Sequence, residues 1–247
     1  MILRLYRSKS DIENLSKLRT LDKPENYSSV DFKRTVVNKP WGYEYLMFEN
    51  NHVAVWVLYL NGGAQTSMHC HPNKKTSLIV VHGKIILSTL EGEYNLRHGD
   101  GLIIDDGVFH SSLARSKKGS YLIEVESPPI KRDLVRLKDD YGRQMQGYEG
   151  SDKMSRELKN YDYIDFHEDY NLKFLKNYGL SILHSNDIFK ARGDLLCLLE
   201  GTILTEDEEI FLTCGEIVDT RDFKSQHALK NSGNLSWLLV TNGKKSI

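Results

Sequence analysis

Short apolar segments separated by turn residues dominate the chain from residue 43 to residue 126. They are rich in β-branched and aromatic residues, and several alternate apolar with polar positions, which is typical of strands with one buried face. The turn residues between them are mostly glycine, asparagine and aspartate. The pattern predicts strands at 43–48, 52–60, 65–70, 77–81, 84–90, 94–97, 102–104, 109–114 and 121–126. Short strands at this spacing indicate a β-sandwich or a closed barrel.

The remaining segments carry weaker signals. Ser10-Asp-Ile-Glu13 has the form of a capping box ahead of apolar residues at helical spacing, which predicts a short helix from about residue 11 to 20. Residues 151–160 have a helix-forming composition and are expected to form a linker helix. Residues 161–178 show no clear period. Strand patterns resume after Gly179, at 180–184, 195–199, 202–205, 209–213, 217–219, 226–229 and 237–241.

Three histidines indicate a metal site. His69 and His71 stand two residues apart in a predicted strand, so both imidazoles lie on the same face. Neutral imidazole is the commonest protein ligand for a divalent metal, and His110 on a later strand would complete the set. Gly99-Asp100 and Asp106-Gly107 favour tight turns on either side of the short strand before His110. The alternative is a metal-free pocket in which the histidines form hydrogen bonds or act as a base.

This arrangement resembles the two motifs of the cupin superfamily. The first motif, G-x5-H-x-H-x(3,4)-E-x6-G, aligns with Gly63, His69, His71, Thr76 and Gly83. The second motif, G-x5-P-x-G-x2-H-x3-N, aligns with Gly99, Asp105, Gly107, His110 and Ala114. Every glycine and histidine is in register, but Thr76, Asp105 and Ala114 replace the Glu, Pro and Asn of the motifs. The resemblance implies a jelly-roll barrel that binds a divalent metal and lacks the family's Glu ligand.

A second resemblance covers about residues 36 to 143. The segment from Asp133 to Arg143 is similar to the D-[IL]-V-R-x-x-D-x-Y-G-R ending of the cupin domain in type II mannose-6-phosphate isomerases. Lys39-Pro-Trp-Gly42 is similar to the Pro-Trp-Gly start of that domain. In that family the ligand strand reads Q-x-H-x-H, and Ser67 occupies the Gln position here. The isomerase ligand set of Gln, His, Glu and His is therefore reduced at Ser67 and Thr76, while a sugar or sugar phosphate ligand is still implied.

These resemblances divide the chain into four parts. They are an N-terminal extension with a short helix (1–38), a cupin barrel with the metal site (39–130), a linker with a short helix (131–178) and a degenerate cupin-like barrel (179–247). In the last part Glu200-Gly201 mirrors His82-Gly83, and His227 with Asn231 repeats the end of the second motif, but no His-x-His precedes Gly201 at the matching distance. The expected fold class is all-β, with a cupin jelly-roll barrel followed by a second, degenerate one.

The composition argues against several classes of binding partner and site. Lys plus Arg (33) nearly balances Asp plus Glu (34), which argues against nucleic-acid or membrane-surface binding. The three cysteines are too few and too scattered for a disulfide framework or a four-cysteine zinc site. No apolar run is long enough to span a bilayer, and residues 1–7 lack the apolar core of a signal peptide. A cytoplasmic protein is expected. The two barrels are expected to pack as an intramolecular pair or to form a homodimer, because cupin-like barrels leave a sheet edge that needs covering.

Other residues near the histidines are candidates for the same site. Three imidazoles suit Zn²⁺, Fe²⁺ or Ni²⁺ better than Mg²⁺ or Ca²⁺, which prefer carboxylates. By strand alternation Gln65 and Ser67 share the face of His69, where they would add a ligand, support one by a hydrogen bond, or form ordinary polar lining. The hydroxyl of Thr76 would hold a water molecule.

Four residues are candidates for substrate binding. Lys75, together with its neighbour Lys74, would contact an anionic group such as a sugar phosphate, or the two form a solvated pair of loop lysines. Arg136, Tyr141 and Arg143 would close over the pocket, or form salt bridges that fix the tail of the barrel.

Three function hypotheses follow, each with a small-molecule ligand. The leading one is a metal-dependent sugar or sugar phosphate isomerase, in surface polysaccharide synthesis, in which a base moves the proton. Its base is not identified, because Glu44, Glu124 and Glu126 serve only if they point inward. The second is a non-catalytic sugar-binding or regulatory cupin, which the degenerate second barrel favours. The third is a three-histidine Fe²⁺ dioxygenase, for which no Glu ligand is expected.

Overall fold

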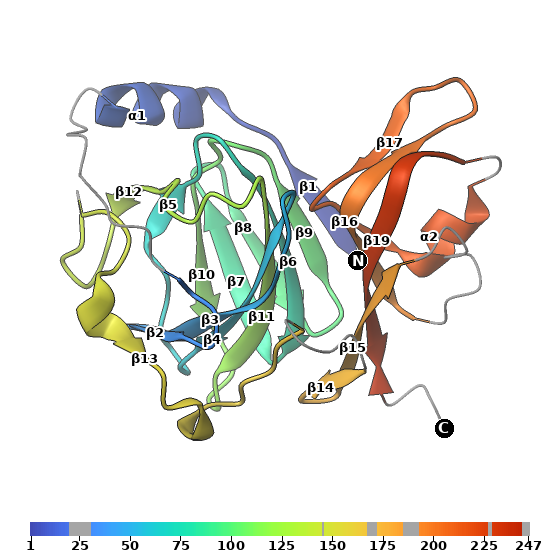
Figure 1. The fold of residues 1–247 in the computed structure, drawn as a ribbon. Coiled ribbons are helices and arrows are strands. Elements are labelled where there is room, and N and C mark those ends of the chain that lie inside the picture. The colour runs from blue at the N-terminus through green and yellow to red at the C-terminus, as the bar shows by residue number, and fades with distance from the viewer. Residues whose placement is uncertain (20–30, 145, 167–171, 185–192, 227–228, 244–247) are drawn as a thin grey trace.

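The computed structural model describes residues 1–19, 31–144, 146–166, 172–184, 193–226 and 229–243 (Figure 1). Strands make up most of the secondary structure in these residues, so the expected all-β fold class is confirmed. The described α-helices are α1 (Lys9–Arg19) and α2 (Thr220–Ser225). None of the described helices is long and apolar enough to cross a membrane.

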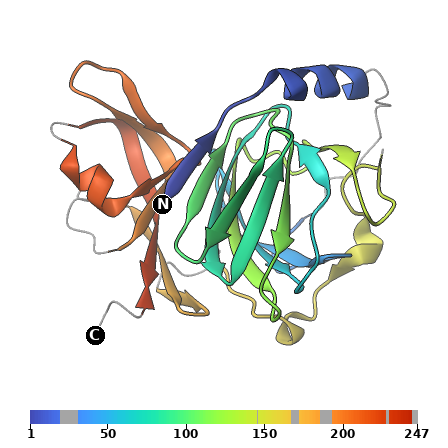
Figure 2. The ribbon, with the colours of Figure 1, turned by 180° about the vertical axis from the view of Figure 1, so that it is seen from behind.

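Two facing sheets form the N-terminal barrel. The larger sheet has the order β1 (Ile2–Leu5), β9 (Gly101–Ile104), β6 (Lys75–His82), β11 (Ser120–Ser127), β4 (Ala54–Leu60), β3 (Gly42–Glu49), β2 (Val36–Lys39) and β13 (Met154–Ser155). The smaller sheet has the order β12 (Val135–Lys138), β5 (Met68–Cys70), β10 (His110–Ala114), β7 (Lys84–Thr89) and β8 (Glu93–Arg97). All pairs are antiparallel except β1 with β9, which lie side by side in Figure 2.

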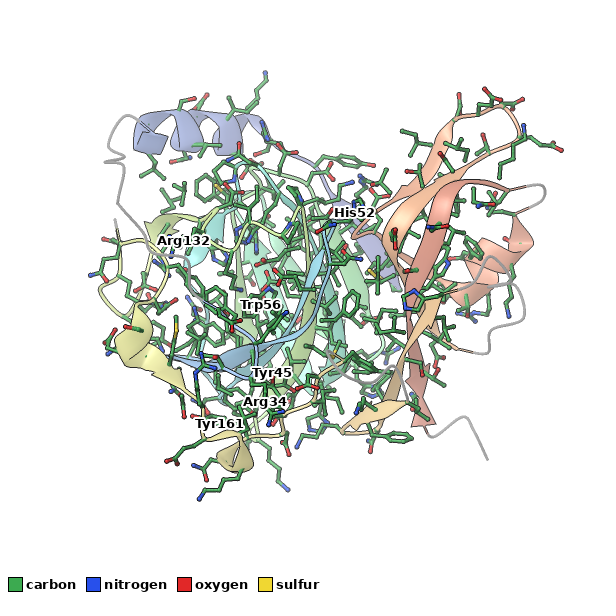
Figure 3. All side chains as sticks on the ribbon, viewed as in Figure 1. Arg34, Tyr45, His52, Trp56, Arg132 and Tyr161 are labelled. Carbon is green, nitrogen blue, oxygen red and sulfur yellow. The ribbon has the colours of Figure 1, made fainter. Side chains whose placement is uncertain are left out.

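Both faces of the larger sheet are buried, which explains the nearly continuous apolar runs of its central strands. On β4, Trp56 and Leu58 point into the barrel, while Val55 and Val57 point outward into a second core. Trp56 lies among the barrel strands in Figure 3. The barrel interior therefore keeps a separate environment from the outer face of the same sheet.

The C-terminal strands form one sheet that covers this outer face. Its order is β14 (Lys173–Leu175), β15 (Tyr178–His184), β19 (Lys230–Asn242), β16 (Leu195–Leu204) and β17 (Ile210–Thr213), and β18 (Ile217–Asp219) also pairs with β16. Leu180, Ile182 and Cys197 pack in one core cluster with Ile79 and Tyr121 of the barrel. The apolar contact between the two sheets removes the outer face of the barrel from water.

Charged groups fix the same contact. The buried carboxylate of Glu216 lies 2.5 Å from the Lys75 amine and 2.9 Å from the Arg4 guanidinium. Lys75 belongs to β6 and Arg4 to β1, so one carboxylate ties two barrel strands to the C-terminal sheet. Whether this sheet derives from a second cupin barrel stays a prediction, and His227 of its expected motif lies outside the described residues.

Several elements differ from those expected. Residues 2–5 form a strand rather than part of a plain extension, because their backbone pairs with β9. Residues 151–160 form two 3₁₀ turns, Ser151–Lys153 and Leu158–Asn160, on either side of β13 instead of one linker helix. The chain is held extended there by pairing of β13 with β2. The barrel sheets thus recruit strands outside residues 39–130, and the four-part division itself remains a prediction.

The segment that follows residue 160, for which the sequence predicts no regular element, packs on the outer face of the larger sheet. Tyr161 stacks edge-on against Tyr43, with ring centroids 4.8 Å apart, and the Tyr45 hydroxyl donates to the Asp162 carbonyl at 2.7 Å (Figure 3). Phe166 follows and is fully buried in the same core cluster. These aromatic contacts join the barrel to the chain that leads toward the C-terminal sheet.

We predict that stability depends on the contact between the sheets. Leu180→Ala should lower the free energy of unfolding by about 2–5 kcal/mol, since Leu180 is fully buried against the barrel. Leu172→Ala, the same substitution at a residue that is 52% exposed, should change it by no more than about 0.5 kcal/mol. Urea denaturation of both variants measures this. Equal losses would mean that the C-terminal sheet does not depend on its packing against the barrel.

Candidate metal centre

The structure brings His69, His71 and His110 together. His69 on β5 pairs directly across the strands with His110 on β10, and His71 follows β5 by one residue. The ring centroids lie 4.6 Å apart for His69 and His110, 5.0 Å for His69 and His71, and 5.5 Å for His71 and His110. One nitrogen from each ring lies within 4.8 Å of the other two. The spacing expected for a three-histidine site is therefore present.

Backbone carbonyls orient all three rings. Nδ1 of His69 lies 2.7 Å from the Ser67 carbonyl, Nδ1 of His71 lies 2.6 Å from the Asp133 carbonyl, and Nδ1 of His110 lies 3.0 Å from the Val108 carbonyl. A carbonyl oxygen only accepts, so each Nδ1 carries the hydrogen and each Nε2 keeps its lone pair.

The Nε2 atoms are left to face the cavity. Nε2 of His71 is buried and has no hydrogen-bond partner among the described residues. A buried polar atom in that position is costly unless something binds it. Three such lone pairs, each supported by a backbone hydrogen bond, fit the donor set of a divalent transition metal.

Burial keeps these rings neutral. It lowers the pKa of His69 and of His71 well below the ordinary value, and the neighbouring His110 and Lys74 respectively add to the effect. Burial also lowers the pKa of His110 to about 4. At neutral pH all three rings are therefore in the form that donates a lone pair to a metal.

Three carboxylates share the cavity, which sequence reasoning could not establish. Glu124 and Glu126 alternate with Val125 on β11, so both point into the barrel, and Glu44 on β3 does the same. Glu126 pairs in register with Thr76 of β6, the position of the missing motif Glu. The strand next to the motif thus supplies carboxylates that the motif itself lacks.

Two of the three carboxylates are neutralised by lysines. The Lys74 amine lies 2.7 Å from Glu126, and the Lys131 amine lies 3.3 Å from Glu126 and 3.0 Å from Glu44. Lys39 lies 3.3 Å from Glu44. Lys74 is fully buried, so the expectation of a solvated lysine pair at residues 74 and 75 is wrong for this residue.

Glu124 is different, because its nearest charged partner is a histidine. Its carboxylate lies 3.9 Å from Nε2 of His71, and within the described part of the chain no lysine or arginine lies within 4.0 Å of it. Burial, and then the negative charge of Glu126, raises the pKa of Glu124 to about 7. Glu124 is therefore the carboxylate of this cavity that is free to act on a ligand.

The two arginines of the predicted substrate set lie in the cavity wall and form ion pairs there. Arg136 and Arg143 line the cavity, and both pair with Glu149, at 3.4 and 2.7 Å. Arg143 also pairs with Asp139 at 2.6 Å. Tyr141 does not reach the cavity: it is 38% exposed and lies against the Arg143 guanidinium.

Three other candidates lie outside the cavity lining. Gln65 is not among the residues that line the cavity, whereas Thr66 and Ser67 both line it. The regular strand begins only at Met68, so strict alternation does not extend back to Gln65. Thr76 is buried beside Glu126 but does not line the cavity. Lys75 points the other way, to Glu216 of the C-terminal sheet.

The cavity next to the histidines is small, about 60 Å³. That volume accommodates a few water molecules or the reacting end of a ligand. Its wall combines three imidazoles, three carboxylates and four basic side chains, so any ligand there meets hydrogen-bonding groups on most sides.

Comparisons with known proteins give fold likenesses only. No family model matches the sequence, and no curated protein matches it. Among solved structures, KdgF from a Halomonas species is 18% identical, with 37% of this chain and 84% of that chain covered and a TM-score of 0.36. A sugar phosphate isomerase from a cupin superfamily, from Silicibacter pomeroyi, is 16% identical, with 44% and 69% covered and a TM-score of 0.36.

A third similar solved structure is that of a capsular polysaccharide assembling protein. The capsular polysaccharide assembling protein CapF from Staphylococcus aureus is 15% identical, with 42% of this chain and 32% of that chain covered and a TM-score of 0.38. Identity and structural similarity at this level do not say what this chain binds.

We predict that the buried carboxylate of Glu44 makes the free energy of unfolding depend on pH. Burial alone would raise its pKa, but Lys131, Lys39 and the Tyr148 hydroxyl lower it to about 2 from an ordinary value of 4.5. Because the folded pKa is the lower one, this stabilisation is complete above pH 4.5 and is lost as the pH falls toward 2. The loss should be about 3 kcal/mol.

Unfolding free energies measured from pH 5 to pH 2 check this. Glu44→Gln should remove about 3 kcal/mol of the pH dependence. Glu91→Gln, in an exposed turn, should leave the curve unchanged. An unchanged pH dependence in Glu44→Gln would contradict the proposed ion pairing.

Proposed function

We propose that this chain is a metal-dependent cupin enzyme that isomerises a sugar or sugar phosphate. The observation that carries the proposal is the placement of Glu124 in one cavity with three Nε2 lone pairs. The isomerase hypothesis lacked a base, and Glu124 supplies one. A merely structural barrel has no need to bury a carboxylate without a cationic partner, because such burial is costly.

His69, His71 and His110 would hold the metal. The metal would polarise a carbonyl group and the hydroxyl on the adjacent carbon. Zn²⁺, Fe²⁺ and Ni²⁺ are the candidates, since imidazole nitrogens suit these ions.

Glu124 would move the proton. As a carboxylate it accepts a proton from the carbon that bears the hydroxyl, which leaves an enediolate. It then gives a proton to the former carbonyl carbon, after partial exchange with solvent, while the hydroxyl proton passes to the former carbonyl oxygen, so aldose and ketose interconvert. The pair Glu126 and Lys74 beside it stays charged and paired, and it keeps the cavity wall fixed.

The charges of the wall limit what binds next to the histidines. Lys39, Lys131, Arg136 and Arg143 line the cavity, and each is already paired with a carboxylate. The reacting end of the substrate is therefore proposed to be an uncharged hydroxy-carbonyl group, with any phosphate at the far end. A homodimer and a cytoplasmic location remain part of this proposal.

Metal content and turnover test the proposal together. Protein loaded with Zn²⁺, Fe²⁺ or Ni²⁺ should bind one equivalent of that metal. In D₂O it should catalyse exchange of the hydrogen on the carbon next to the carbonyl group of at least one aldose or aldose phosphate. Glu124→Gln should keep the metal and lose turnover by about 100-fold or more. His69→Ala and His110→Ala should lose the metal. His52→Ala, in an exposed turn, should keep both the metal and the turnover.

Other outcomes would overturn the proposal. Full metal binding without exchange for any sugar, together with sugar binding, would identify a binding protein instead. Oxygen uptake with Fe²⁺ would identify a dioxygenase. If the wild type takes up no metal, no metal-dependent function survives.

A further inference from the structure

A second cavity lies where the barrel meets the C-terminal sheet, and we call it the seam cavity. Its barrel side is formed by the turn between β6 and β7 and by the loop that follows β10, and its other side by the start of β15. Its volume is about 440 Å³, against about 60 Å³ for the histidine cavity. A volume in this range accommodates a whole small ligand. The C-terminal sheet lies beside the barrel in both ribbon views (Figures 1 and 2).

The seam cavity is basic on every charged position of its lining. The basic residues of the lining are Lys84, Lys117, Lys118, His82 and His98, and no aspartate or glutamate of the described residues lines it. In a chain whose formal net charge is −1, this grouping is a local feature. Within the described residues the three lysine amines make no ion pair. This contrasts with the histidine cavity, where every lysine is neutralised by a carboxylate.

Positive charge beside the seam cavity acts on His82. Burial, and then the charges of Lys176 and His98, lowers the pKa of its imidazole. The amine of Lys176 is itself paired with the Asp162 carboxylate at 2.6 Å, and neither residue lines the seam cavity. Like charges held together without a counterion are unfavourable, and an anion bound among them would relieve the repulsion.

Uncharged hydrogen-bonding groups complete the wall. Ser116, Asn177, Tyr178 and Asn242 line it, and among the described residues Val81 is the one aliphatic side chain of the lining. Tyr178 is 2% exposed, and its hydroxyl lies 3.4 Å from Nδ1 of His98. Hydroxyl and amide groups suit the hydroxyls of a polyol, whereas the lysines suit a phosphate.

We propose that the seam cavity binds a small phosphate ester, with the phosphate held by Lys84, Lys117 and Lys118. The site is distinct from the histidine cavity. Lys75 and His82 mark opposite ends of β6, about 20 Å apart at the rise of a strand. Lys75 lies near the histidine end and His82 lines the seam cavity, so the second site does not depend on the proposed enzyme activity.

Isothermal titration calorimetry of the full chain at fixed ionic strength tests this. Inorganic phosphate and glucose 6-phosphate should bind saturably at one site per chain, and glucose should not. Lys117→Gln combined with Lys118→Gln should weaken binding about tenfold or more, because two charge-assisted contacts are lost. Both lysines are exposed, so the variant should keep the melting temperature of the wild type.

Two further variants control for charge and for the other cavity. Lys9→Gln combined with Lys159→Gln removes the same charge from exposed positions elsewhere and should leave affinity unchanged. His69→Ala, in the histidine cavity, should also leave it unchanged.

Any of the following results would overturn the proposal: no saturable binding, full affinity in the Lys117 and Lys118 variant, equal weakening in the Lys9 and Lys159 variant, or loss of binding in His69→Ala. Saturable binding of inorganic phosphate but not of glucose 6-phosphate would reject a phosphate ester as the ligand.

Discussion

Three backbone carbonyls, of Ser67, Val108 and Asp133, each accept the Nδ1 hydrogen of one of the three histidines, and the cavity is built on this constraint. It fixes the tautomer of every ring and turns the Nε2 atoms toward one another. Two of these carbonyls lie close to the histidine strands, but Asp133 comes from the segment before β12. The Asp133 carboxylate also accepts from the Asn73 backbone N–H at 2.7 Å, which holds that segment in place. The candidate metal centre therefore depends on the chain segment that precedes β12.

The second requirement is that buried charges come in pairs. Removing one partner of such a pair leaves an uncompensated charge and costs about 3–5 kcal/mol, so Lys74 with Glu126 and Lys131 with Glu44 hold one another in position. Glu124 stands apart from these pairs and faces the histidines. On the other side of β6, the pairing of Lys75 with Glu216 fixes the C-terminal sheet. The consecutive residues Lys74 and Lys75, where β6 begins, thus stabilise the histidine cavity and the contact with the C-terminal sheet.

Strand alternation and motif spacing were enough to predict the barrel strands and the meeting of the three histidines. They were not enough for Glu124 and Glu126, because β11 is buried on both faces and its apolar run gives no sign of which side is the cavity. Gln65 was assigned to the histidine face by alternation, but the regular strand begins after it. The buried state of Lys74 depends on Glu126, a partner 52 residues away in the sequence. Contacts of this kind follow from the fold and not from local pattern.

The central claim is that the three Nε2 atoms hold a divalent metal within reach of Glu124. Anomalous diffraction from crystals of metal-loaded protein, collected on both sides of the absorption edge of the metal, tests it most directly. The account predicts one strong anomalous peak about 2.0–2.2 Å from Nε2 of His69, His71 and His110. A peak bound through Nδ1, a peak elsewhere on the chain, or no peak at all would contradict it.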